Sequence, residues 1–96
     1  MPEEVRRAAD LLERRWTVSI IWASHSGAVR FGEFMQALGG SIPPATLTVR
    51  LGELERAGIL ERQVVDARPP RAEYRLTARG TELRGLVAAL RLLAKA

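Results

Sequence analysis

Two helical patterns separated by a pair of glycines constrain the fold of this chain more than any other feature. The first pattern covers residues 32–38 and ends where Gly39 and Gly40 break the apolar periodicity. The second covers residues 43–57, and Gly58 supplies its stop. Its apolar stripe, at i, i+4 and i+7, consists of Leu47, Leu51 and Leu54. This layout predicts a helix-turn-helix, in which one helix supports a second helix that contacts a partner outside the domain.

The segments on either side of this motif complete the expected domain. Residues 59–77 contain two strand-like runs joined by ARPPR, which predicts a basic hairpin, or wing. Thr77 is suited to cap the helix that follows. The other helices are expected over residues 2–15, 16–26 and 78–95. The sequence therefore predicts a single domain over residues 1–96 that is mainly α with a small β-hairpin wing, the winged helix-turn-helix class.

Composition excludes several classes of site. Cysteine is absent, which removes disulfides, thiolate catalysis and thiol-based redox sensing together. With one histidine, His25, and no cysteine, we expect no metal site and no cofactor. His25 more simply serves as a cation at a helix C-terminus. The sequence has no paired carboxylates, nucleophile-base pair or phosphate-cradling glycine loop, so we expect no enzyme activity.

The longest apolar run is too short to cross a membrane, and the N-terminus has no pattern of a secretory leader. We therefore expect a cytoplasmic protein that does not contact the membrane.

The charge balance favours a polyanionic partner. Fifteen basic residues face 11 acidic ones, which gives a net charge of +4 and a pI near 11.0. Double-stranded DNA is the expected partner, contacted by the outer face of the 43–57 helix and by a basic rim around it. The candidate DNA-binding residues are Arg30, Pro44, Ala45, Thr46, Thr48, Val49, Arg50, Arg56, Arg68 and Arg71.

Few of these candidates are suited to reading bases. Arginine on guanine, or asparagine and glutamine on adenine, normally supply direct readout, and on this face only Arg56 is of that kind. Thr46 and Thr48 can hydrogen-bond to bases or phosphates, whereas Ala45 and Val49 can touch thymine methyl groups. We therefore expect strong backbone contact, limited direct readout and some dependence on DNA shape.

The first and last helices carry apolar stripes wider than one core contact requires. A second copy would cover them, so we expect a homodimer with two-fold symmetry. The alternative is that the last helix only packs back on the 16–26 helix. Four arginines fall off the first stripe and are expected to be solvated rather than to contact DNA: Arg6, Arg7, Arg14 and Arg15. The candidate interface residues are Val5, Ala9, Leu12, Trp16, Leu83, Leu86, Val87, Leu90 and Leu93.

Four ordered segments resemble the HxlR-type winged helix-turn-helix transcriptional regulators, relatives of the MarR group. They are WTVSII, VRFGEFMQAL, Ile42 with the later TLTVRLGELERAGILER, and RPPRAEYRLTARG, which together cover most of residues 16–80. The resemblance implies a regulator that binds duplex DNA as a homodimer, with the N- and C-terminal helices forming the interface.

Three departures from the family pattern concern function. The sensing cysteine that members often carry near the N-terminus is absent, so that switch is not carried over. Glu13, Arg14 and Arg15 replace the glycines that usually precede the tryptophan, which leaves no glycine to separate the first two helices. In the 43–57 helix, the usual polar residues give way to Pro43, Ala45 and Val49.

Two other interpretations stay open at this point. A winged helix can also serve as a protein-interaction or assembly module with little or no specific DNA binding, and the apolar Ala45 and Val49 favour that use. A small-molecule effector held between the wing, the 16–26 helix and the dimer helices is the third interpretation, although no polar cluster demands it.

Overall fold

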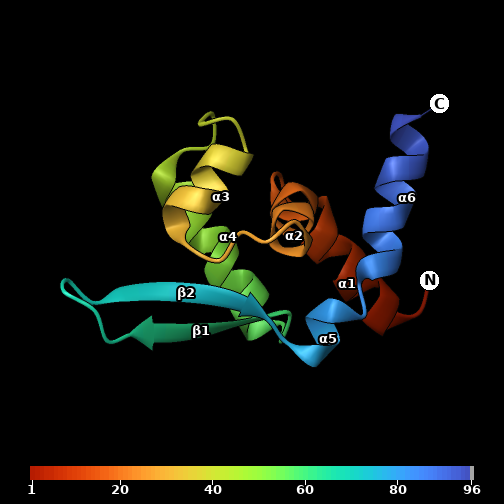
Figure 1. The fold of residues 1–96 in the computed structure, drawn as a ribbon. Helices are drawn as coiled ribbons and strands as arrows, with labels where there is room; N and C mark the ends of the chain where they lie inside the picture. The colour runs from red at the N-terminus through yellow and green to blue at the C-terminus, as the bar shows by residue number, and fades with distance from the viewer. Residues whose placement is uncertain (96) are drawn as a thin grey trace.

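The computed structural model describes residues 1–95 and places six helices and one hairpin among them (Figure 1). The elements are α1 (Glu3–Glu13), α2 (Thr17–His25), α3 (Phe31–Ala37), α4 (Pro44–Arg56), β1 (Leu60–Val65), β2 (Arg71–Leu76), α5 (Ala78–Thr81) and α6 (Arg84–Ala94). The predicted fold class, mainly helical with a two-stranded antiparallel wing, is confirmed.

The core lies where α2, α3 and α4 meet the start of the wing. The three leucines of the α4 stripe are fully buried, as the i, i+4 and i+7 spacing predicts. Phe34 of α3 and Ile42 of the following turn are buried with them. Helix α2 is apolar on most sides and contributes Ile20, Ile21 and Ala23. The two helices of the motif are therefore held by one continuous apolar cluster.

The wing is a regular antiparallel hairpin whose register runs from the Leu60–Leu76 pair to the Val65–Arg71 pair. A short third segment lies against its β2 edge. The Tyr74 N–H donates to the Val29 carbonyl at 2.7 Å, and Arg30 and Glu73 form an isolated bridge. This backbone contact joins the base of the wing directly to the residue that precedes α3.

The break between α1 and α2 forms without glycine. Helix α1 ends at Glu13, two residues before the expected boundary, and Trp16 adopts a left-handed conformation with φ of 80°. A left-handed residue ends helices, and glycine usually supplies it because a side chain there is strained. The Arg15 guanidinium lies 4.9 Å from the centroid of the Trp16 ring, a cation–π contact at the junction.

The expectation of one helix over residues 78–95 was wrong, because the segment forms two helices with a sharp turn between them. Thr77 caps the first, α5, by accepting a hydrogen bond from the Gly80 N–H at 3.0 Å. The Leu83 N–H then bonds to the Gly80 carbonyl three residues back, which tightens the turn. The chain leaves this turn in a new direction, and α6 packs against α2 while its C-terminal end projects from the domain (Figure 1).

Gly80 lets the backbone of α5 touch the backbone at Ile59, just before β1. A Cβ atom at this position would lie 2.2 Å from the Ile59 carbonyl oxygen, so only glycine permits the approach of α5 to the start of β1. On the other side, His25 Nε2 donates to the Gly80 carbonyl at 3.1 Å. His25 therefore has a structural contact that ties α2 to α5.

Candidate nucleic-acid interface

Helix α4 presents a largely apolar outer face opposite its buried leucines. Pro44, Ala45, Thr48 and Val49 are exposed, and 51% of Val49 is accessible to solvent. Thr46, on the flank, is half-buried. The Thr48 hydroxyl donates to the Pro44 carbonyl at 3.2 Å, which leaves it free to accept rather than to donate toward a base. The face therefore offers methyl groups and few hydrogen-bond donors, as the sequence predicts.

Arg56 reaches further along this face than its position suggests. Its Nη1 atom lies 3.5 Å from where a Cβ atom of Gly52 would stand, so the side chain folds back over the preceding turn of α4. Because Gly52 has no side chain, the guanidinium lies beside Gly52, in the last turns of α4, rather than beyond the C-terminal end of the helix. The sequence pattern located Arg56 but did not indicate this direction.

Arg50 is used inside the protein. Its Nε donates to the Arg15 carbonyl at 2.9 Å, and its Nη1 lies 3.2 Å from Glu53 Oε1. Glu53 also pairs with Arg14 from the junction between α1 and α2. The side chain of Arg50 is only 20% exposed. It therefore braces α4 against the start of α2, and little of it is accessible to a DNA strand.

A second group of basic side chains lies where the wing meets the helix-turn-helix. Arg30, from the segment before α3, and Arg71, from β2, are both exposed and both lie near the carboxylate of Glu73. Arg75 joins them and makes the shortest of the three contacts. Arg75 was not among the predicted residues, although its position two residues after Glu73 on a strand places it on the same face. Arg68 is exposed at the tip of the wing, beyond this group.

Glu33 fixes the entry to α3. Its carboxylate accepts the N–H groups of Val29 at 3.0 Å and Arg30 at 2.9 Å, as an acidic residue does in a capping box. The backbone N–H of Val29, followed by that of Arg30, lowers the pKa of Glu33 below its ordinary value. These two hydrogen bonds to Glu33 hold the backbone of Val29 and Arg30 in place next to the wing.

The predicted dimer residues separate into accessible and buried groups. Val5 on α1 is 47% exposed, and Leu93 near the end of α6 is 72% exposed. Val87 is buried within the protomer, so it is not available to a partner. The remaining predicted residues are half-buried: Ala9, Leu12, Trp16, Leu83, Leu86 and Leu90. Leu92, which was not predicted, is 74% exposed beside Leu93.

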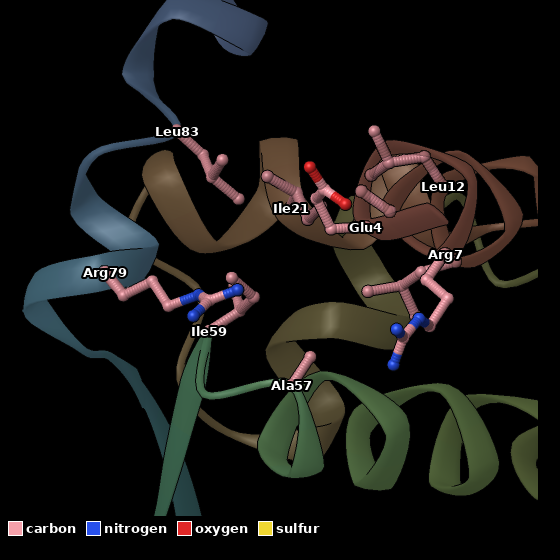
Figure 2. A pocket seen from close by; sticks show the side chains of 10 residues that line it. Glu4, Arg7, Leu12, Ile21, Ala57, Ile59, Arg79 and Leu83 are labelled. Atoms are coloured by element: carbon pink, nitrogen blue, oxygen red, sulfur yellow. The ribbon is translucent and has the colours of Figure 1, made fainter. Parts of the chain in front are cut away.

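A cavity of about 450 Å³ lies between α1, the end of α4 and α5 (Figure 2). Leucine, isoleucine and alanine side chains form most of its walls, and Glu4, Arg7 and Arg79 add charge. Figure 2 shows the Arg79 side chain lying beside Ile59. The location overlaps the region between α2 and the dimer helices that was predicted for an effector, but of the predicted wing, residues 59–77, only Ile59 lines it.

Within residues 1–95, no group of three or more histidine, cysteine, aspartate or glutamate side chains is arranged to hold a metal ion. No helix in this part of the chain is long and apolar enough to cross a membrane.

The hairpin that follows two packed helices, with the outer face of α4 open to solvent, defines a winged helix-turn-helix domain. The family model described as HxlR-like helix-turn-helix matches residues 11–96, and the chain belongs to this family. The resemblance stated from the sequence is confirmed.

Several relatives are similar to this chain over most of its length. A transcriptional regulator of Synechocystis, itself uncharacterized, is 38% identical over 89 residues, which cover 93% of this chain and 65% of the relative. An uncharacterized regulator of Mycobacterium tuberculosis is 41% identical over 81 residues, which cover 84% of this chain and 50% of the relative. The chain thus spans about half to two thirds of the length of these relatives. These relatives are named as transcriptional regulators rather than as enzymes.

Solved structures agree with this assignment. The reduced form of the transcriptional regulator YodB from Bacillus subtilis has a TM-score of 0.83 and 34% identity, covering 98% of this chain and 91% of that one. The redox regulator HypR in its reduced form has a TM-score of 0.83 and 31% identity, and the match covers 97% of this chain and 91% of HypR. The chain is similar to both along nearly its whole length.

Proposed function

We propose that this chain is a transcriptional regulator of HxlR type that binds duplex DNA as a homodimer. The observation that carries the proposal is the exposed outer face of α4 together with the basic group where the wing meets the helix-turn-helix. Helix α4 is the element that a helix-turn-helix domain places in the major groove, and these arginines are suited to phosphate oxygens. The names of the relatives support the regulatory role.

The composition of the α4 face predicts how DNA is bound. Methyl groups of Ala45 and Val49 fit against thymine, whereas Arg56, lying back over Gly52, is the one side chain of this face suited to guanine. Most of the affinity then comes from arginine contacts with the backbone, which carry no sequence information. We therefore expect modest sequence preference with marked dependence on salt.

Dimerisation is proposed from the exposed apolar residues of α1 and α6. Leu92 and Leu93 are exposed near the C-terminal end of α6, and Val5 is exposed on α1. Leaving leucines at 72% and 74% exposure costs free energy that a partner helix would recover. A dimer with two-fold symmetry presents two α4 helices to a palindromic site.

Selection of bound sequences from a random duplex pool tests this proposal. We expect enrichment of two half-sites related by a dyad, about one helical turn apart, with A·T-rich positions outside them. Enrichment of a single half-site without a dyad would contradict the dimer but keep the DNA-binding function.

The protein-interaction module is the second candidate, and the exposed Val49 on a face with few hydrogen-bond donors favours it. If this alternative is right, the selection enriches no sequence, and the purified chain does not retain the random duplex pool on a filter at low salt. Retention that salt abolishes would instead favour DNA binding.

A further inference from the structure

Glu73 is a charged residue on the exposed wing, yet only 7% of it is accessible to solvent. Carboxylates are rarely so buried unless they are paired. Glu73 Oε1 lies 2.8 Å from Arg75 Nη2, whereas Oε2 lies 3.7 Å from Arg30 Nε and 3.9 Å from Arg71 Nε. One carboxylate therefore lies among three guanidinium groups.

These arginines come from two different parts of the fold. Arg71 and Arg75 flank Glu73 on the same face of β2, and Arg30 comes from the segment before α3. The backbone bridge between Arg30 and Glu73 and the hydrogen bond from the Tyr74 N–H to the Val29 carbonyl hold the two segments together. Glu73 thus lies at the join between the wing and the helix-turn-helix.

The group keeps an excess of positive charge. Three arginines and one carboxylate carry a net charge of +2, and the three arginine side chains are between 41% and 53% exposed. Each guanidinium has five N–H donors, of which Glu73 occupies only a part, so donors remain for another anion. Without the carboxylate, three like charges so close together would repel each other and move apart.

We propose that Glu73 is a positioning residue for DNA binding, which gathers Arg30, Arg71 and Arg75 into one cluster that contacts the DNA backbone. This inference rests on the proposed function, because it assigns a role within the same DNA-binding surface. The cluster joins β2 of the wing to the segment before α3, so it fixes the wing relative to the helix-turn-helix.

If Glu73 positions the arginines, its substitution should change DNA affinity in the direction opposite to the usual one. Removing a carboxylate from a DNA-binding surface normally tightens binding, because it removes repulsion from the phosphates. If Glu73 positions the arginines, Glu73→Gln weakens binding instead. Repulsion and positioning therefore predict opposite changes in affinity for the same substitution.

Glu61 supplies a matched control. It is an exposed carboxylate on β1, directly across the hairpin from Arg75, and so lies on the same face of the wing as Glu73. Among residues 1–95, its side chain has a hydrogen bond only with the Gln63 amide and forms no ion pair. Glu61→Gln makes the same change of charge in the same hairpin without releasing an arginine.

The test is a titration of the full chain against a labelled duplex of fixed sequence at several salt concentrations. We expect Glu73→Gln to weaken binding about tenfold and to lower the salt slope by about one to two, as when one or two phosphate contacts are lost. Glu61→Gln should bind as tightly as wild type or more tightly. A thermal melt of each variant separates loss of fold from loss of contact.

A double-mutant cycle separates positioning from general support of the fold. In a chain that already carries Arg30→Ala, Arg71→Ala and Arg75→Ala, Glu73→Gln should cause no further weakening, because the arginine contacts that Glu73 organises are gone. An additional tenfold loss in that background would overturn the inference. So would equal or tighter binding by Glu73→Gln in the wild-type background. If wild type itself does not bind duplex, the proposed function fails, which is a different result.

Discussion

At the scale of single residues, Gly80 makes the closest backbone contact that a side chain would block. Because an added Cβ atom would lie 2.2 Å from the Ile59 carbonyl oxygen, Gly80→Ala should force α5 away from β1. We expect a loss of about 3 kcal/mol of unfolding free energy, or a fall in Tm of more than about 10 °C. The change in Tm is measured by thermal denaturation monitored by circular dichroism.

Gly85 is the matched control for this substitution. It lies in the first turn of α6, and an added Cβ atom would meet nothing within 4 Å. Gly85→Ala should therefore raise stability by about 0.5 to 1 kcal/mol, because alanine favours helix more than glycine does. If both variants were equally stable, the assigned contact between Gly80 and Ile59 would be wrong.

Glu33 should give stability that depends on pH. Its folded pKa is lowered by the N–H groups of Val29 and Arg30, so its contribution is fully present above the ordinary value of 4.5. The contribution is lost as the pH falls through the lower folded pKa. Glu33→Gln should consequently be less stable than wild type at pH 7, and this difference should shrink on acidification.

Melting wild type and Glu33→Gln between pH 7 and about pH 3 checks this expectation. Glu55→Gln is the control, since the Glu55 carboxylate has no hydrogen bond within residues 1–95. A difference in Tm between wild type and Glu33→Gln that stays constant with pH would show that the contribution of the Glu33 cap does not depend on its ionisation.

At the scale of elements, the sequence predicts α4 and the wing well because their signals are local. The leucine spacing in α4 and the two strand runs around ARPPR each determine their own element. The break before α2 and the division of the last helix depend on distant contacts. Trp16 adopts a left-handed conformation where no glycine signals it, and the turn after α5 follows from Gly80 touching Ile59.

The candidate site shows the same difference between local and distant information. The outer face of α4 follows from helical periodicity, so Ala45 and Val49 are exposed as predicted. Periodicity gives the direction of a Cβ atom but not where a long side chain ends. Arg50 therefore turns inward to the Arg15 carbonyl, and Arg56 lies back over Gly52. Burial of Glu73 required Arg30, which lies 43 residues away in the sequence.

The wing should add affinity without adding sequence preference. Arg68 is exposed at the tip of the hairpin, outside the cluster around Glu73. Arg68→Ala should weaken binding to all duplexes to a similar extent and lower the salt slope by about one. Binding curves for two unrelated duplexes measure both effects, with Arg84→Ala on α6 as the control. Weakened binding to only one of the two duplexes would mean that Arg68 reads bases.

At the scale of the whole molecule, assembly should depend on the end of α6. Leu93→Glu places a charge on a side chain that is 72% exposed in the protomer, so the fold should survive. If α6 forms the interface, the variant should sediment as a monomer and bind DNA more weakly, because two linked sites become two separate ones. Ala88→Glu, another exposed α6 position, is the control on a different face of the helix.

Sedimentation of wild type as a monomer at micromolar concentration would contradict the proposed interface. A dimer that Leu93→Glu leaves intact would place the interface on another surface.

The central claim is that this winged helix-turn-helix domain binds duplex DNA mainly through its arginines. The most direct measurement is the fluorescence anisotropy of a labelled duplex titrated with the wild-type chain at about 50 mM and about 200 mM salt. We predict saturable binding that weakens steeply between the two, with log affinity falling linearly against log salt concentration. Absence of saturable binding at the lower salt concentration, or affinity that does not change with salt, would contradict the claim.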